Sequence, residues 1–482
     1  MPTPTVDLPP MPAVWPVKRI DPNDAVGEAL LANLQANILR DHGRDLGLLV
    51  FFQFGAAGDN NRKALGAAAD LVTSALEQYR AARDYEAAVA RKDGAALPEV
   101  PILTLSLSRT GFEACALTGP TDETDTFAGG MEKRMAARPG ESEPMKDPPK
   151  ATWEEPLQRI LHGVWMIAAG TADGLASALA AVQQWMGDYA VVRHDEPQPC
   201  GRWRPGPSKK AREPFGFADG ISVPEFIVTD KFRGNDPSID IPLAQVLIAD
   251  AGSEHRGGSF LVLRKLEQNV DAFRTFEGKL KGAVAQAGGE AALAESLIVG
   301  RDHEGNPLAP DWTPAKDPND FSFDPDCNAR RCPFDAHIRK ANPRFPHNTE
   351  GLPLEAQIGA QMVRRSMVYG IGQLTLDGPV FPTEKVGLWF MAYMRSIEAQ
   401  FLTMHSFWMM EPEKPLNTLK PGVPRFSDPL LFGGLTPTEK NPNPTEWSWR
   451  GIRCGGLQQF VKPRGGEFFF TPSLRWLANV TV

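Results

Sequence analysis

The chain has 482 residues, more than one ordinary hydrophobic core accommodates, so two domains are expected. Hydrophobic residues make up 42% of the chain and charged residues 23%, which is typical of a soluble globular protein. The formal net charge of −8 argues against a nucleic-acid partner or an anionic membrane, because both require a basic face. No run of about 18 apolar residues is present, so no transmembrane helix is expected.

The first 22 residues are rich in proline and are expected to form an extended arm. They lack the basic start and apolar run of a secretory signal, so we expect a cytoplasmic location, with secretion by another route left open. The five cysteines are too few, and odd in number, for a disulfide framework. Cys327 and Cys332 have a spacing close to that of a metal knuckle, but no second pair of Cys or His residues completes a zinc site.

Helical and strand patterns alternate through the first half of the chain. Helices are predicted at residues 23–40, 61–90 and 171–187, and strands at residues 46–54, 102–108, 163–170 and 190–193. The helices are long enough to cover one face of a sheet. Residues 23–195 are therefore predicted to form an α+β domain of ferredoxin-like type.

Residues 196–212, EPQPCGRWRPGPSKKAR, interrupt all periodicity and predict a linker. The remaining residues, 213–482, are predicted to form a second domain that could repeat the fold of the first. Its predicted strands are 259–264, 388–394 and 467–471, its predicted helices are 269–286 and 397–409, and residues 298–342 are rich in loops.

One histidine in the second half lies in a basic segment, residues 332–344 (CPFDAHIRKANPR). His337 is followed there by Arg339, Lys340 and Arg344. Imidazole is a common metal ligand and holds haem iron from the proximal side, and the cations could pair with an anionic cofactor. Composition alone favours a solvated surface histidine, so the interpretation depends on other motifs.

Together with two other segments, this one resembles the dye-decolourising peroxidase family, whose members are haem enzymes. The GxxDG motif of the family is present at residues 216–220, and an Arg364–Arg365 pair precedes Tyr369–Gly370. The order of the motifs also matches. Similar segments near the N-terminus, at residues 126–138 and at the last strand extend the resemblance over nearly the whole chain, and long loops at 120–156 and 300–329 place it with the longer members.

The resemblance implies two ferredoxin-like domains with antiparallel sheets and peripheral helices, and one haem b per chain held in the C-terminal domain. It implies reduction of hydrogen peroxide to water through a high-valent iron intermediate, with oxidation of dyes, phenols or other aromatic donors. Two other functions stay open: a haem-binding or iron-release protein of the same fold, and a non-haem interaction protein in which the motifs are accidental. Either a monomer or a homodimer is compatible with the sequence.

The resemblance also assigns the residues around the iron. His337 is the expected axial ligand, with Asp428 as its hydrogen-bond partner and Glu398 as the alternative partner. Asp428 precedes a proline, so it could equally just start a turn. Asp219 is the expected distal acid–base group, although an Asp-Gly pair is also a common turn. Arg364 is expected to stabilise negative charge on the peroxide, with Arg365 as the alternative for facing the iron.

Further residues are expected around the cofactor. Leu388 and Phe390 alternate on one predicted strand and should border the distal pocket. By resemblance, residues 223–226, from Val223 to Phe226, run beside the haem edge. Arg339, one of the cations beside His337, is expected to contact the cofactor. Candidates for relaying electrons from bulky donors are Trp389, Trp408 and Tyr369, although most such aromatic side chains simply belong to a core.

Overall fold

The computed structural model describes residues 8–91, 100–122, 125–135, 145–204, 210–228, 240–345, 352–370, 385–414, 426–435 and 443–480. The helices are α1 (Ala25–Asn33), α2 (Asp59–Ala68), α3 (Ala75–Arg91), α4 (Arg109–Ala114), α5 (Thr126–Met135), α6 (Ala172–Asp188), α7 (Val270–Gln286), α8 (Leu293–Val299), α9 (His337–Ala341), α10 (Leu354–Gly359), the π-helix η4 (Ile397–Met409), α11 (Pro429–Phe432) and α12 (Leu474–Asn479). The strands are β1 (Leu46–Gln53), β2 (Ile102–Ser108), β3 (Gly163–Ala169), β4 (Val192–Arg193), β5 (Gln198–Gly201), β6 (Ser259–Gln268), β7 (Val363–Arg364), β8 (Met367–Tyr369), β9 (Gly387–Met394), β10 (Glu446–Trp449), β11 (Ile452–Gly455) and β12 (Val461–Thr471).

Most of these strands belong to one antiparallel sheet that closes on itself. The strand order is β3-β2-β12-β6-β9-β8-β5-β1-β4, β7 pairs with β9, and β1 also pairs with β3. Strand β1, the last but one in this order, pairs with β3 at the other end and so closes the path into a barrel-like ring. Strand β12 lies between β2 from the first half of the chain and β6 from the second half, so both halves share a single sheet.

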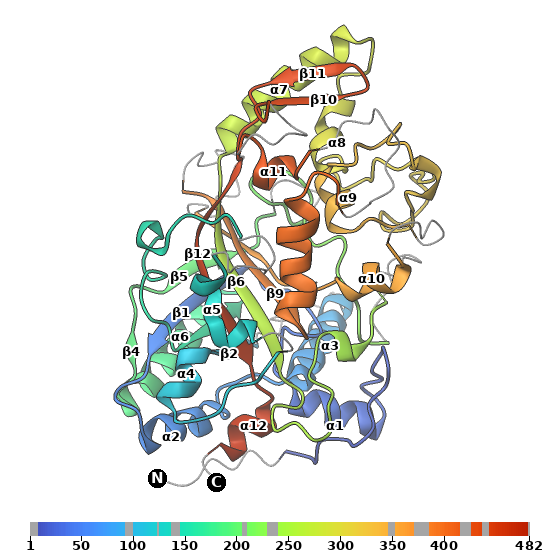
Figure 1. Ribbon diagram of the computed structural model, residues 1–482. Coiled ribbons are helices and arrows are strands. Elements are labelled where there is room, and N and C mark those ends of the chain that lie inside the picture. Colours follow the sequence, from blue (N-terminus) through green and yellow to red (C-terminus); the bar gives the residue numbers. More distant parts are fainter. Residues whose placement is uncertain are drawn as a thin grey trace.

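Two large apolar clusters hold the structure together. The first surrounds the sheet and includes Phe51, Trp165, Phe260 and Phe470, which are all essentially inaccessible to solvent. The second packs α7, the loop-rich segment around α9 and the β10–β11 hairpin against one another, with Phe273 near its centre. Figure 1 shows α7, α8 and this hairpin at one end of the molecule, beyond the end of the sheet.

The α+β fold class and most of the predicted elements are confirmed, but two predicted helices are shorter than their patterns indicate. The helix predicted at 23–40 ends at Asn33, and Asn37 beyond it has a left-handed backbone with φ of 65°. The helix predicted at 61–90 is divided into α2 and α3. Ser74 begins α3 with a capping box: its hydroxyl accepts from Glu77 N at 3.0 Å, and the Glu77 carboxylate accepts from Ser74 N at 2.7 Å.

The segment predicted as a linker, residues 196–212, contains strand β5, which pairs with β1 and β8. These residues are therefore partly built into the sheet. The helix predicted at 397–409 is present over the same residues as the π-helix η4. Among the described helices, none has the length and apolar character required to cross a membrane.

Candidate active site

A cavity of about 290 Å³ lies where β9, η4, α9 and the loop after residue 213 meet. Apolar side chains form most of its wall, among them Leu266, Leu388, Phe390, Phe401, Met404 and Leu431. A smaller set of polar side chains also faces it, including Asp219, Arg264, Arg301, His337, Arg344 and Arg364. The three motifs of the sequence, far apart along the chain, therefore contribute to one apolar cavity with a few convergent polar groups.

His337 is the first residue of α9, and its side chain is 33% exposed, toward the cavity. Its Nδ1 lies 2.6 Å from Oδ2 of Asp428, which is completely buried. The other carboxylate oxygen of Asp428 accepts from Leu430 N and Leu431 N and so caps helix α11. Both interpretations of Asp428 therefore apply, because it starts a helix and contacts His337. Nε2 of His337 is the ring nitrogen left for a ligand in the cavity.

Glu398, the alternative partner for His337, lies elsewhere. Its carboxylate pairs with Arg134 and accepts from the Thr126 hydroxyl at 2.9 Å. A second histidine, His405, does line the cavity. It is stacked on Phe401 with ring centroids 5.4 Å apart, and burial holds its pKa well below the usual range.

Arg339, expected at the cofactor, does not line the cavity. Its guanidinium is 1% exposed and donates to Asp326 Oδ2 at 2.9 Å and to Cys332 O at 2.6 Å. The Asp326 carboxylate also accepts from three consecutive backbone N–H groups, those of residues 330–332. Arg339 therefore fixes the loop that precedes His337.

Two other arginines face the cavity: Arg344, one of the cations that the sequence places near His337, and Arg301, which the sequence did not single out. Each is 6% exposed, and both donate to the hydroxyl of Ser222, at 3.1 Å and 3.2 Å. Arg344 also lies over the Phe321 ring, 4.2 Å from its centroid. They lie 36 and 7 positions from His337 in the chain, and both contact Ser222, Asn319 and the Phe321 ring.

The loop that carries Asp219 is shaped by glycine and by a buried carboxylate. Gly216 and Gly220 have φ of 105° and 74°, a left-handed backbone that explains why the motif has glycine at both positions. Glu213 accepts from Phe215 N at 2.9 Å, from Phe217 N at 2.8 Å and from the Gln268 side chain at 2.6 Å. Burial raises the pKa of Glu213. Glu213 was not expected from the sequence, although it lies only three residues before the motif at 216–220.

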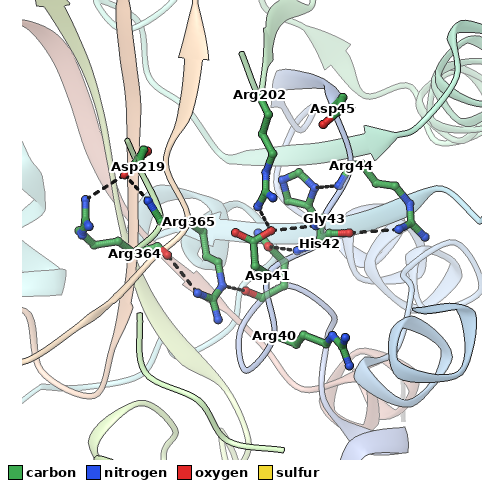
Figure 2. A network of polar contacts seen from close by, with 12 residues as sticks. Arg40, Asp41, His42, Gly43, Arg44, Asp45, Arg202, Asp219, Arg364 and Arg365 are labelled. Atoms are coloured by element: carbon green, nitrogen blue, oxygen red, sulfur yellow. Dashed lines mark hydrogen bonds and ion pairs between the residues drawn. The ribbon is translucent and has the colours of Figure 1, made fainter. Parts of the chain in front are cut away.

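The two consecutive arginines point to opposite sides of the chain, as Figure 2 shows. Arg364 Nη1 lies 3.8 Å from Asp219 Oδ1, and both side chains line the cavity. Arg365 is 2% exposed and donates to Asn37 O at 2.8 Å and to Ile38 O at 3.0 Å. This geometry identifies Arg364 as the arginine that faces the cavity.

A larger hollow, which we call the vestibule, adjoins the cavity. It has a volume of about 950 Å³, and Asp219 and Arg364 line both spaces. Charged side chains of both signs line the vestibule, and many of them are paired, such as Arg202 with Asp41 and Arg212 with Glu304. The pair formed by Asp219 and Arg364 therefore lies between the inner cavity and the outer vestibule.

Some of the remaining predicted residues line the cavity, and the others do not. Leu388 and Phe390 line the cavity, as expected from their alternation on β9. Val223 lines the vestibule, not the cavity, and Phe226 is completely buried in the apolar cluster around the sheet. The candidate relay residues Trp389, Trp408 and Tyr369 are buried as well, at 1%, 2% and 7% exposure.

Comparison with known proteins identifies the family. A family model described as the DyP dimeric alpha+beta barrel domain matches residues 33–197, and one described as the C-terminal part of Dyp-type peroxidases matches residues 211–420. The chain is 30% identical over 481 residues to the multifunctional dye peroxidase DyP2 of Amycolatopsis sp., covering 95% of this chain and 97% of that protein. It is 26% identical to the dye-decolorizing peroxidase msp1 of Mycetinis scorodonius, covering 93% of this chain and 87% of that protein.

Solved structures agree with this result. The DyP-type peroxidase AnaPX of Anabaena sp. superposes with a TM-score of 0.75 at 27% identity, covering 96% of this chain and 97% of that one. DyP2 of Amycolatopsis sp. gives a TM-score of 0.75 at 28% identity, covering 96% and 99%.

The chain belongs to the dye-decolourising peroxidase family. It is therefore an oxidoreductase, a peroxidase that acts on dyes, and the comparisons do not favour the alternative of a haem-binding or iron-release protein with little peroxidase role.

Proposed function

We propose that this peroxidase binds one haem b per chain in the cavity, reduces hydrogen peroxide there and oxidises aromatic donors. The observation that carries the proposal is the convergence on one cavity of His337, bonded to Asp428, and of the Asp219–Arg364 pair. One solved relative, a dye-decolorizing peroxidase at 25% identity and a TM-score of 0.70, is a complex with 2,6-dimethoxyphenol, which supports a phenolic donor.

The residues that line the cavity suit the group that the family requires. The apolar wall accommodates a macrocycle, the buried Arg301 and Arg344 would pair with its two carboxylates, and Nε2 of His337 would hold the iron. When bound, haem supplies the redox chemistry by which a peroxide is reduced and a donor is oxidised.

Asp428 determines how His337 behaves as a ligand. Its carboxylate accepts a hydrogen bond from the Nδ1–H group, which fixes the tautomer and makes the imidazole more electron-donating. Two backbone N–H groups hold the same carboxylate in place, so the orientation of the ring is set by the N-terminus of α11.

Asp219 and Arg364 would have different roles in the reaction with peroxide, at the part of the cavity wall that adjoins the vestibule. We assign to Asp219 the transfer of a proton from one peroxide oxygen to the other, because its carboxylate lines both the cavity and the vestibule. We assign to Arg364 the stabilisation of negative charge on the departing oxygen, since its guanidinium keeps its charge at any working pH. The vestibule is the route by which peroxide reaches this pair.

The experiment compares Asp219→Asn with Arg364→Leu in stopped-flow mixing with hydrogen peroxide, followed at the Soret band from about pH 3 to 8. Each substitution should lower the rate of reaction with hydrogen peroxide on the order of 10²-fold or more. Asp219→Asn should also abolish the acid-side pH dependence, because an amide cannot accept the peroxide proton. Arg364→Leu should keep that dependence, because it retains the Asp219 carboxylate.

Asp317→Asn is the matched control, since Asp317 lines the vestibule but not the cavity. It should react with peroxide at the native rate. Native rates in both Asp219→Asn and Arg364→Leu would show that neither residue faces the iron. Absence of a Soret band in the native protein would contradict haem binding itself.

A further inference from the structure

Lys340 carries a charged group that is almost completely buried on the His337 side of the cavity. The side chain is 1% exposed. Its Nζ donates to the backbone oxygens of Glu411 at 2.6 Å, Lys414 at 2.7 Å and Trp408 at 3.1 Å, and also lies 3.4 Å from Pro412 O. Within the part of the chain that the structure describes, all hydrogen-bond acceptors of this ammonium are backbone carbonyls, which is unusual for a buried lysine.

These carbonyls explain how the ammonium is tolerated. They belong to the last turn of η4 and the residues directly after it, where helical carbonyls lack intrahelical partners and carry partial negative charge. Burial lowers the pKa of Lys340 to about 8, and Asp335 and Asp428 act in the opposite direction. Lys340 is therefore charged in neutral and acid solution and closes the C-terminal end of η4.

The same lysine completes a closed ring of contacts around His337. Lys340 and His337 lie on α9, one turn apart. Lys340 holds the end of η4 through Trp408 O, and Met409 O of η4 accepts from Asp428 N at 2.7 Å. Asp428 in turn contacts His337 Nδ1 at 2.6 Å. Any displacement of α9 from η4 must therefore stretch the bond between His337 and Asp428.

We propose that Lys340 is a positioning residue for His337, holding α9 against η4 so that the imidazole keeps its bond to Asp428 and its direction into the cavity. The inference rests on the proposed function only in that His337 is taken as the axial ligand. The ring itself consists of protein groups alone, so it can be tested in protein prepared without haem.

The test is proton NMR of the haem-free protein. A histidine N–H bonded to a buried carboxylate resonates far downfield, and the His337 Nδ1 proton is assigned by its absence in His337→Ala. In Lys340→Met, this resonance should shift upfield and broaden, because the His337–Asp428 bond lengthens and the proton exchanges faster with water. Lys340→Gln, which keeps two N–H donors, should show a smaller shift and remains measurable if Lys340→Met does not fold.

Lys265→Met is the matched control. Lys265 is also buried, at 9% exposure, but it pairs with Glu154 at 2.8 Å and its ammonium lies over Tyr369 and Trp389, away from the cavity. It should leave the His337 resonance unchanged even if stability falls. A native His337 resonance in folded Lys340→Met or Lys340→Gln would overturn the proposal and leave Lys340 a purely structural residue.

A second readout separates this inference from the proposed function. In the reduced haem protein, Lys340→Met should lower the iron–histidine stretching frequency in the resonance Raman spectrum, because a weaker Nδ1 bond makes imidazole a poorer donor. If the native protein shows no such band, His337 is not the axial ligand and the proposed function fails. The NMR result would still decide whether Lys340 positions His337.

Discussion

Asp428 uses its two carboxylate oxygens for two different tasks. Oδ1 caps helix α11 and Oδ2 contacts His337, so a single substitution ordinarily disturbs both. Asparagine separates them, because it caps helices as well as aspartate but carries no charge. The two roles of Asp428 can therefore be tested separately, because a different oxygen atom serves each.

We expect Asp428→Asn to raise the reduction potential of the iron and to lower the free energy of unfolding less than Asp428→Ala does. The imidazole loses its anionic partner and becomes a weaker donor, which disfavours the oxidised iron. Asp428→Ala should raise the potential as well and should lower the free energy of unfolding by about a further 1 kcal/mol, because the cap is also lost. Spectroelectrochemistry and thermal unfolding of the two variants test this. An unchanged potential in both would mean that the contact is absent from the haem protein.

At the residue scale, the sequence indicates cavity-lining residues where one short motif contains them, and does not where several segments have to meet. His337, Asp219 and Arg364 each belong to a short recognisable motif, and all three reach the cavity. Arg339 was selected because it lies near His337 in the chain, but Asp326 binds it. Arg301, in contrast, reaches the cavity through contacts with Ser222 and Asn319, which no local pattern indicates.

At the scale of elements, the loop that carries Asp219 depends on the segment after α8. Ala218 N donates to His303 O at 3.0 Å, and the His303 ring lies edge-on to Phe217 with centroids 4.3 Å apart. His303 Nε2 lies 3.4 Å from a carboxylate oxygen of Glu277 on α7. The nearby Glu277 carboxylate raises the pKa of His303 above its ordinary 6.5.

This ion pair predicts a pH-dependent contribution to stability. Because the folded state raises the pKa, the stabilisation is fully present below about pH 6.5 and is lost as the pH rises through the higher, folded-state pKa. His303→Gln should therefore cost stability at about pH 5.5, by less than about 1 kcal/mol since the side chain is partly exposed, and cost less at about pH 9. Urea unfolding at the two pH values measures the difference. An equal cost at both would show that the charge of His303 plays no part.

Elements that depend on neighbouring residues in the sequence could be predicted, and elements that depend on pairing with distant segments could not. Helices α6 and α7 begin directly after Thr171 and Asn269, whose side chains cap them, and the sequence places both correctly. Strand β5 consists of Gln-Pro-Cys-Gly, which has no strand pattern, and exists because β1 and β8 lie on either side of it. Strand pairing across the chain, not local preference, decides such segments.

At the scale of the whole molecule, the two halves are not independent. Strand β12 supplies the neighbour of β2, and β5 and β8 join the halves on the other side of the ring. A fragment of residues 1–212 would leave β2 with an open edge and an uncovered apolar face. The ferredoxin-like pattern in the sequence therefore describes the connectivity of each half better than its capacity to fold alone.

We expect the protein to unfold in one cooperative step and the fragment 1–212 to show no cooperative transition. Far-ultraviolet circular dichroism and tryptophan fluorescence should give coincident urea curves for the whole chain, because β12 couples both halves. Two separated transitions, or a cooperative transition in the fragment, would contradict this.

The opposite directions of Arg364 and Arg365 have a consequence for comparing this chain with others. Successive side chains of a strand alternate, so an insertion or deletion of one residue just before the pair exchanges the two directions. After a one-residue deletion, Arg365 would take the place of Arg364 in the cavity, while Asn37 and Ile38 would face Ser366. A sequence alignment that matches any arginine at this position would not reveal that the buried arginine bonded to Asn37 and Ile38 is missing. The strand register in homologous chains is therefore better judged by whether the second arginine can bond to the segment equivalent to Asn37 and Ile38 than by the presence of the first arginine.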